Sequence, residues 1–182
     1  MILRTARIES PVGTLTLLSS DAGLCALSFD DEDAALERCL GRFPGADVRR
    51  DADPAGAVRA LAAYFAGDLA AIDRIPVDLG GTPFQASVWR ELRCIPAGAT
   101  RSYRDLAIAI GRPSATRAVG LANGQNPVAI VVPCHRVIGA DGRLVGYGGG
   151  IPRKRWLLSH EGARPERDRE PALFPEYAAA AR

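Results

Sequence analysis

The stretch SYRDLAIAIGRPSATRAVGLANG, residues 102–124, decides the fold of the second half of this chain. Ser102, followed three residues later by Asp105, is a capping-box pattern that predicts the start of a helix. Gly111 and Pro113 predict a break, and Ser114 is in position to cap a second helix that runs to about residue 123. Two short helices joined in this way have the proportions of a helix-turn-helix, although plain packing pairs share them.

The second helix of this pair carries few large side chains. Arg117 projects from a surface that is otherwise covered largely by small residues. These are Ala115, Ala118, Gly120 and Ala122. Such a helix either packs closely against another helix or approaches a narrow surface that one arginine enters. A helix that reads the major groove of DNA carries asparagine, glutamine or several arginines at base-contacting positions. The smooth surface therefore fits the minor groove better.

The rest of the chain predicts an α+β fold with two domains. Runs at 2–9, at 14–19 (rich in β-branched residues and leucine) and at 24–29 are separated by turns and indicate an antiparallel β-meander. Helices are expected at about 30–43 and 55–66. Gly80-Gly81 indicates a linker, and Thr82-Pro83-Phe84-Gln85 begins another helix with a cap, a proline at the first position and a capping-box glutamine.

We therefore expect three parts. A small N-terminal domain, residues 1–80, contains the meander and its helices. A mostly helical, winged-helix-like domain, residues 81–162, contains the helix-turn-helix. Residues 163–182, rich in arginine, proline, alanine and glutamate, form a tail that is mobile or docks late.

The composition excludes disordered and membrane-spanning classes. The chain has 182 residues, of which 47% are hydrophobic and 24% charged, so it is too apolar for a disordered chain. No apolar stretch reaches the roughly 18 residues that suggest a membrane span. Arg4 stands where a signal peptide needs its apolar region. We expect a cytoplasmic protein without a membrane partner.

The formal net charge of +2 conceals an uneven distribution. Residues 1–83 hold 8 arginines and 13 acids, whereas residues 84–160 hold 11 basic residues and 3 acids, a net of +8. A basic segment of this kind indicates a polyanionic partner such as nucleic acid. The alternative is a solvated arginine-rich surface, since 22 of the 23 basic residues are arginine.

The chain has four widely spaced cysteines, Cys25, Cys39, Cys94 and Cys134. No Cys-x-x-Cys pair occurs among them. With only two histidines in the chain, we expect neither a metal site nor a disulfide framework. Reduced, mostly buried thiols are the default, because free cysteine behaves as a small hydrophobic residue.

One cysteine stands in a setting that suggests chemistry. The run 128–132 is apolar and β-branched and predicts a buried strand that ends at Cys134-His135. A histidine beside a thiol favours the reactive thiolate. Because successive strand side chains point to opposite faces, a bridging water would have to connect the two unless the backbone turns. Asp141 and Glu161 are the candidate carboxylates to hold the imidazole, and a buried cysteine beside a satisfied histidine is the alternative.

These residues identify a family. The chain closely resembles the 6-O-alkylguanine-DNA alkyltransferases, also called methylated-DNA–protein-cysteine methyltransferases, in an ordered set of motifs: Arg117-Ala118-Val119-Gly120, Asn126-Pro127, Pro133-Cys134-His135-Arg136-Val137 and Gly146-Tyr147. The resemblance is strong over about residues 82–162, and the N-terminal meander is compatible with the variable first domain of that family.

The resemblance implies DNA repair by a cysteine S-methyltransferase. Such a protein would transfer the alkyl group of O6-alkylguanine to its own Cys134, once and irreversibly, without a cofactor. It would bind double-stranded DNA through the minor groove and flip the base, since the target atom is inaccessible within a duplex. We expect a monomer in solution. O4-alkylthymine as a second substrate, the preferred alkyl size and clustering along DNA stay open.

The resemblance also implies roles for individual residues. His135 matches the residue that deprotonates Cys134 through a water, Glu161 the carboxylate that orients His135, and Asn126 the residue that fixes the adjacent turn. Tyr103 matches the tyrosine that helps rotate the nucleotide, and Arg117 the finger that fills the gap. Contacts to DNA or to the flipped base are expected from the following set: Tyr103, Ser114, Arg117, Ala118, Gly120, Val137 (through its carbonyl), Tyr147 (covering the base) and Gly148.

The chain departs from some relatives at Gly148, where they carry a serine. A hydroxyl contact to the lesion oxygen is then impossible, and a smaller residue leaves room for larger alkyl groups. Other classes remain as alternatives: a DNA-binding regulator, a non-reactive lesion sensor of the same fold, and a cysteine hydrolase. The smooth helix, the presence of Cys134 and the absence of an evident oxyanion hole disfavour them in turn.

Overall fold

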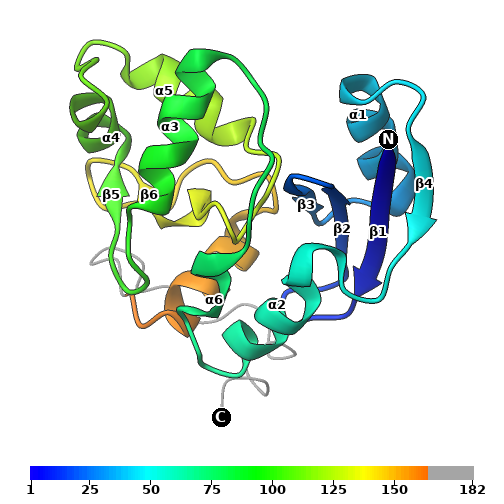
Figure 1. Cartoon of the computed structure of the whole chain (residues 1–182). Coiled ribbons are helices and arrows are strands. Elements are labelled where there is room, and N and C mark those ends of the chain that lie inside the picture. Colours follow the sequence, from blue (N-terminus) through cyan, green and yellow to red (C-terminus); the bar gives the residue numbers. More distant parts are fainter. Residues whose placement is uncertain (164–182) are drawn as a thin grey trace. The chain divides into compact units, whose positions relative to one another are not determined.

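The computed structural model describes residues 1–163. The chain divides into two compact units (Figure 1): Met1–Gly80 with Pro127–Val131, and Gly81–Asn126 with the chain from Val132 onward. Residues 164–182, most of the expected tail, lie outside the described residues. Ala163 is buried with Ile138 and Leu158, so the packed part of the chain extends at least to this residue. Within residues 1–163, no helix is both long enough and apolar enough to cross a bilayer.

The first unit is built on a four-stranded sheet of order β3-β2-β1-β4. The strands are β1 (Ile2–Ile8), β2 (Leu15–Ser20), β3 (Gly23–Ser28) and β4 (Asp47–Arg50). The first three pair antiparallel, which confirms the predicted meander. The fourth strand was not predicted; it runs parallel to β1, with Ile2 opposite Asp47. Its four residues are mostly polar, so no apolar alternation marks it in the sequence.

Helices complete the first unit: α1 (Glu32–Arg42), the 3₁₀ turn η1 (Pro54–Gly56), α2 (Ala57–Phe65) and the 3₁₀ turn η2 (Ala71–Arg74). Asp31 caps α1 by accepting from the backbone N–H of Ala34. Only Ala35 and Cys39 of this helix are fully buried, and both face the sheet among Leu3, Leu18 and other core residues.

The second unit is mainly helical. Its elements are α3 (Pro83–Arg93), β5 (Arg101–Ser102), α4 (Tyr103–Ala109), α5 (Thr116–Gly124), the 3₁₀ turn η3 (Cys134–Arg136), β6 (Val137–Ile138) and α6 (Ile151–His160). Both predicted capping boxes form, Thr82 with Gln85 and Ser102 with Asp105. Helices α3, α4 and α5 pack together (Figure 1), and β5 and β6 form a short parallel pair.

The expected cap at Ser114 was wrong. Helix α5 begins at Thr116, its N-terminal flanking residue is Ala115, and no side chain caps it. The backbone N–H of Ala115 donates to Arg112 O at 2.8 Å, which forms a tight turn after α4. This turn takes up Ser114, so the helix starts later than the sequence pattern indicates.

The predicted strand at 128–132 was also wrong. This segment consists of turns, with Ile130 at φ 68° and the N–H of Val131 bonded to Ala129 O. Pro127 O and the N–H of Ala129 both bond to Leu27 of β3, so the chain joins the first unit briefly and then reverses. A left-handed conformation at isoleucine is strained. Complete burial of this apolar side chain compensates for that strain.

Candidate active site at Cys134

Cys134 opens the 3₁₀ turn η3 and is 6% exposed. The side-chain amide of Asn126 donates to Val132 O at 2.7 Å and to Cys134 Sγ at 3.1 Å. One amide therefore bridges the two ends of the turn segment 126–134 and holds the sulfur. The backbone does turn at this point, so the opposed side chains expected from a straight strand do not apply.

His135 is held by a buried carboxylate. Its Nε2 lies 2.9 Å from Glu161 Oε1, and both side chains are fully buried. Arg136 donates two hydrogen bonds to the same carboxylate, Nε to Oε2 at 2.9 Å and Nη2 to Oε1 at 2.8 Å. Its Nη1 donates to Ile95 O. Of the two candidate carboxylates, Glu161 is the one beside the imidazole, while Asp141 bonds to Arg143 in an exposed turn.

These contacts determine the histidine tautomer. A carboxylate only accepts hydrogen bonds, so Nε2 of His135 carries the ring proton. The other nitrogen, Nδ1, then has a free lone pair, and it is buried with no hydrogen-bond partner among residues 1–163. A buried acceptor without a partner beside a cysteine is suited to receive a proton.

The pKa shifts agree with a neutral resting pair. Burial raises the pKa of the Cys134 thiol, although the Asn126 amide and the Lys154 charge oppose this. Burial lowers the pKa of His135 against the pull of Glu161. For Glu161, burial acts to raise the pKa, but the bonds from His135 and Arg136 prevail and bring it to about 2. The carboxylate therefore remains an anion while the thiol and the imidazole are uncharged.

A fully buried lysine fastens the chain beside this cluster. Lys154 Nζ donates to Val137 O at 2.6 Å and to Val145 O at 2.7 Å. Burial lowers its pKa to about 8, and the nearby Cys134 counteracts this. The Tyr103 hydroxyl donates to the same loop segment, 3.3 Å from Val145 O and 3.4 Å from Gly146 O. Lys154 and Tyr103 thus hold the segment that leads to Tyr147.

The remaining predicted residues lie in two settings. Tyr147 is half-buried, with its ring centroid 6.4 Å from that of His135, and Gly148 is exposed with open space where a side chain would stand. Gly120 on α5 faces the Tyr103 ring, where a methyl group would lie 3.8 Å away. The other three are exposed at or before the start of α5: Ser114, Arg117 and Ala118.

Arg136 and Lys154 are the site residues that the sequence analysis missed. Arg136 lies in the recognised motif, but no spacing rule links it to a carboxylate 25 residues later. Lys154 did carry a signal. It is the only lysine in the chain, and it shares a helical face with the buried Leu157 and Leu158. A lone lysine on an apolar face indicates a specific buried role.

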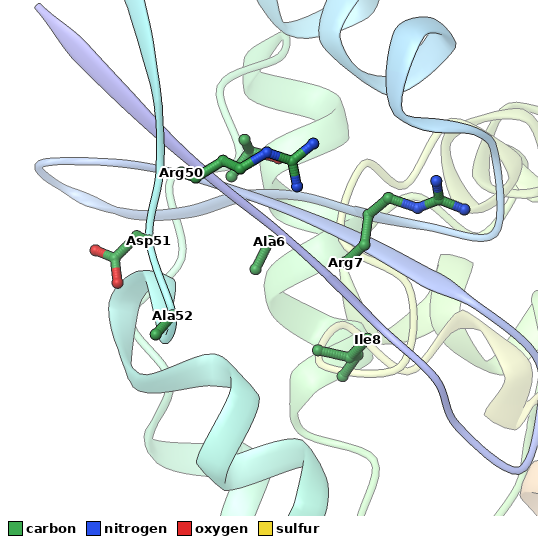
Figure 2. Close-up of a pocket in the computed structure, with 7 residues that line it drawn as sticks. Ala6, Arg7, Ile8, Arg50, Asp51 and Ala52 are labelled. Atoms are coloured by element: carbon green, nitrogen blue, oxygen red, sulfur yellow. The ribbon is translucent and has the colours of Figure 1, made fainter.

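A separate pocket of about 300 Å³ lies in the first unit (Figure 2), lined by Thr5, Ala6, Arg7, Ile8, Arg50, Asp51 and Ala52. Its lining comes from β1, the end of β4 and the residues that follow. Arg50 pairs with Glu32 at 3.0 Å. The lining contains no thiol or imidazole, so this pocket is not a candidate for the chemistry of Cys134.

Two family models match the chain. The first, "6-O-methylguanine DNA methyltransferase, DNA binding domain", covers residues 83–163. The second, the ribonuclease-like domain of the same proteins, covers residues 3–79. The boundary between the models falls at the linker between the two units.

Individual relatives match over most of their length. The methylated-DNA–protein-cysteine methyltransferase of Salmonella typhimurium is 47% identical over 160 residues, 86% of this chain and 94% of the relative. The protein of the same name from Mycolicibacterium paratuberculosis is 52% identical over 155 residues, 85% and 89% of the two chains. The crystal structure of Mycobacterium tuberculosis OGT in complex with DNA superposes with a TM-score of 0.71 at 46% identity, covering 89% of this chain and 93% of that one. This chain belongs to the 6-O-methylguanine DNA methyltransferase family.

Proposed function

We propose that this protein repairs DNA by transferring the alkyl group of O6-alkylguanine to Cys134, in a reaction that consumes the protein. The observation that carries the assignment is the free, buried lone pair on Nδ1 of His135. This histidine directly follows Cys134, whose sulfur accepts a hydrogen bond from Asn126. Family membership supports the reaction class, and this geometry supports the choice of cysteine.

The proton leaves the thiol through the histidine. The family resemblance implies that a water would relay the thiol proton of Cys134 to Nδ1 of His135, and Glu161 stabilises the imidazolium that forms. Arg136 keeps Glu161 ionised, so the proton stays on the imidazole instead of passing to the carboxylate. The Lys154 ammonium and the Asn126 amide favour the negative sulfur at the moment of attack.

The transfer itself is a direct displacement. The sulfur of Cys134 forms a bond to the alkyl carbon while the bond from that carbon to the guanine oxygen breaks. The electron pair of the broken bond passes into the guanine ring. The leaving base takes up one proton, and the proton that Cys134 passed to His135 balances it. The Tyr103 hydroxyl, which burial keeps protonated by raising its pKa, can donate a hydrogen bond to the base without losing that proton. The thioether on Cys134 has no leaving group, which makes the reaction stoichiometric.

DNA would bind in the minor groove and present a flipped base. Within the duplex the target oxygen is inaccessible, and extruding a nucleotide costs a few kcal/mol, as an order of magnitude. Arg117 is exposed on α5 among small residues such as Ala118 and Gly120, which lets the helix approach closely while the guanidinium fills the gap. The basic residues of the 84–160 segment attract phosphates without sequence preference.

The flipped guanine would lie between the Val137 carbonyl and the Tyr147 ring. Lys154 occupies one lone pair of that carbonyl and fixes its direction, which leaves the second lone pair for the base. Tyr103 and Lys154 together hold the chain at Val145, so the Tyr147 loop is positioned before the base arrives. We propose a cytoplasmic monomer as the active form.

Mass spectrometry tests the proposal directly. The protein is mixed with a duplex that carries one O6-methylguanine, and its intact mass is measured. We expect a gain of one methyl group per molecule, mapped to Cys134 by peptide sequencing, with no second turnover. The unmodified duplex is the control. Repeated turnover, or a methyl group on another cysteine, would overturn the assignment.

A further inference from the structure

The first unit contains a second thiol cluster that the transfer reaction does not use. Cys25 on β3 and Cys39 on α1 are 2% and 5% exposed, and their sulfur atoms lie 3.9 Å apart. Cys25 also donates to Leu18 O at 3.3 Å. Two buried cysteines on different elements thus face each other across the contact between α1 and the sheet.

We propose that Cys25 and Cys39 form an oxidisable dithiol site, which a hydroperoxide closes into a disulfide between β3 and α1. A disulfide has a sulfur–sulfur distance of about 2.05 Å, so the two atoms must approach by a little under ~2 Å. Side-chain rotation and a small movement of α1 supply that approach. The site does not depend on the function assigned to Cys134.

The two thiols differ in the way the reaction requires. The thiol of Cys25 has two acceptors in reach, Leu18 O and Cys39 Sγ, so it retains its proton and its pKa is raised. The contact with the Cys25 sulfur lowers the pKa of Cys39, against the effect of burial, and the charges of Arg42 and Arg38 lower it further. Cys39 is therefore the attacking sulfur, because the thiolate is the nucleophile.

The step balances without any other reactant. The Cys39 thiolate attacks one peroxide oxygen, the oxygen–oxygen bond breaks, and an alcohol (water, for hydrogen peroxide) leaves once it is protonated. The resulting sulfenic acid is attacked by the sulfur of Cys25, whose proton leaves with the hydroxyl as water. Two thiols and one hydroperoxide thus give one disulfide, one alcohol and one water.

The packing of α1 explains how peroxide reaches the pair. Ala35 and Cys39 are the fully buried residues of this helix, and Leu36 and Leu40 are packed partly buried beside them. Peroxide therefore reaches the pair when α1 opens locally from the sheet. A covalent bond at this position would add to these contacts and oppose the opening. The closed loop spans residues 25–39, about 15 residues, which is long enough for a measurable gain in stability.

Oxidation of a background variant tests the site. Cys94→Ser and Cys134→Ala leave Cys25 and Cys39 as the only thiols, and hydrogen peroxide is added in equimolar amount. We expect the intact mass to fall by two hydrogen atoms and non-reducing peptide mapping to link Cys25 to Cys39. The melting temperature should rise by about 5–10 °C and return when a thiol reductant is added.

A matched variant and a second probe keep the test decisive. Adding Cys39→Ala to the background should abolish the mass loss and the thermal shift. Phenylarsine oxide, which bridges neighbouring thiols, should bind the background protein before peroxide treatment and not after it; this needs no change at the pair. The proposal is overturned if both thiols remain free after peroxide, or if oxidation stops at sulfinic acid on one cysteine.

Discussion

Both units of this chain contain buried cysteines, but the groups around the sulfur atoms differ, and so does the chemistry that each site suits. In the second unit, Cys134 accepts from an amide and lies close to a buried ammonium and a histidine with a free lone pair. In the first unit, Cys25 and Cys39 have each other as partners. The first arrangement suits attack on carbon, and the second suits closure of a bond between two sulfurs. Local environment, more than residue type, assigns the reaction.

Charge separates the units in the same way. Arginines of the first unit pair with its own acids: Arg4 with Asp21, Arg38 with Asp30, Arg42 with Asp78, Arg49 with Asp47, Arg50 with Glu32, and Arg59 with Asp53. Such surface pairs add little stability, but they cancel the local field. The 84–160 segment has only 3 acids for its 11 basic residues, so its positive field persists.

The largest effect is expected from removing the reactive sulfur. Cys134→Ala should abolish methyl transfer from a methylated duplex and leave DNA binding within about twofold, since a small buried side chain is lost. Cys25→Ala should transfer at the wild-type rate, because that thiol has no role in the reaction. Transfer is measured with radiolabelled duplex, and binding by fluorescence anisotropy. Retained transfer by Cys134→Ala would refute the difference drawn between the two thiol sites.

The next effect concerns the carboxylate behind the histidine. Glu161→Gln should slow transfer by about 100-fold, because the imidazolium loses its stabilising anion and a general base contributes on the order of 10²–10⁴. Asp141→Asn is the matched control and should leave the rate unchanged, since Asp141 bonds only to the exposed turn at Arg143. Single-turnover kinetics with excess protein measure both. Similar losses in both variants would mean that Glu161 acts only through folding.

Arg117→Ala should have an effect that depends on the substrate. The rate on duplex is expected to fall by about 10- to 100-fold, the cost of an unfilled gap in the stack, whereas free O6-benzylguanine should react normally. Arg104→Ala removes a charge from the neighbouring α4 and should weaken duplex reaction less. If Arg117→Ala loses activity equally on both substrates, the residue is structural. If Arg117→Ala and Arg104→Ala lose duplex activity to the same extent, Arg117 acts only as a phosphate contact.

The smallest effect is expected at Gly148. Serine fits there because the position is open and its φ is not positive. Gly148→Ser adds a hydroxyl that can bond to the lesion oxygen, so the methyl rate should rise by up to about threefold, within the value of one hydrogen bond. The benzyl rate should fall, because the pocket is smaller. Rates on the two lesions are compared in parallel. A parallel change in both would show that Gly148 does not set the preference for alkyl size.

Local sequence patterns determined much of the second unit. The capping boxes at Thr82 and Ser102 place the starts of α3 and α4 because a side chain and a backbone group three residues apart satisfy each other. The meander of the first unit follows equally from short strand-forming runs and the turns between them. The adjacency of Cys134 and His135 is a property of the sequence itself. In each case the partners are near neighbours along the chain.

Only the tertiary structure decided the features whose partners are distant. The 128–132 segment turns instead of forming a strand because Pro127 and Ala129 bond to Leu27, about a hundred residues earlier. Glu161 lies 26 residues from His135, and only the fold brings it there in place of the nearer Asp141. The same holds for the hydrogen bonds from Arg136 to Glu161, the burial of Lys154 and the contact of Cys25 with Cys39. Side-chain partners of this kind follow from packing, which no local pattern encodes.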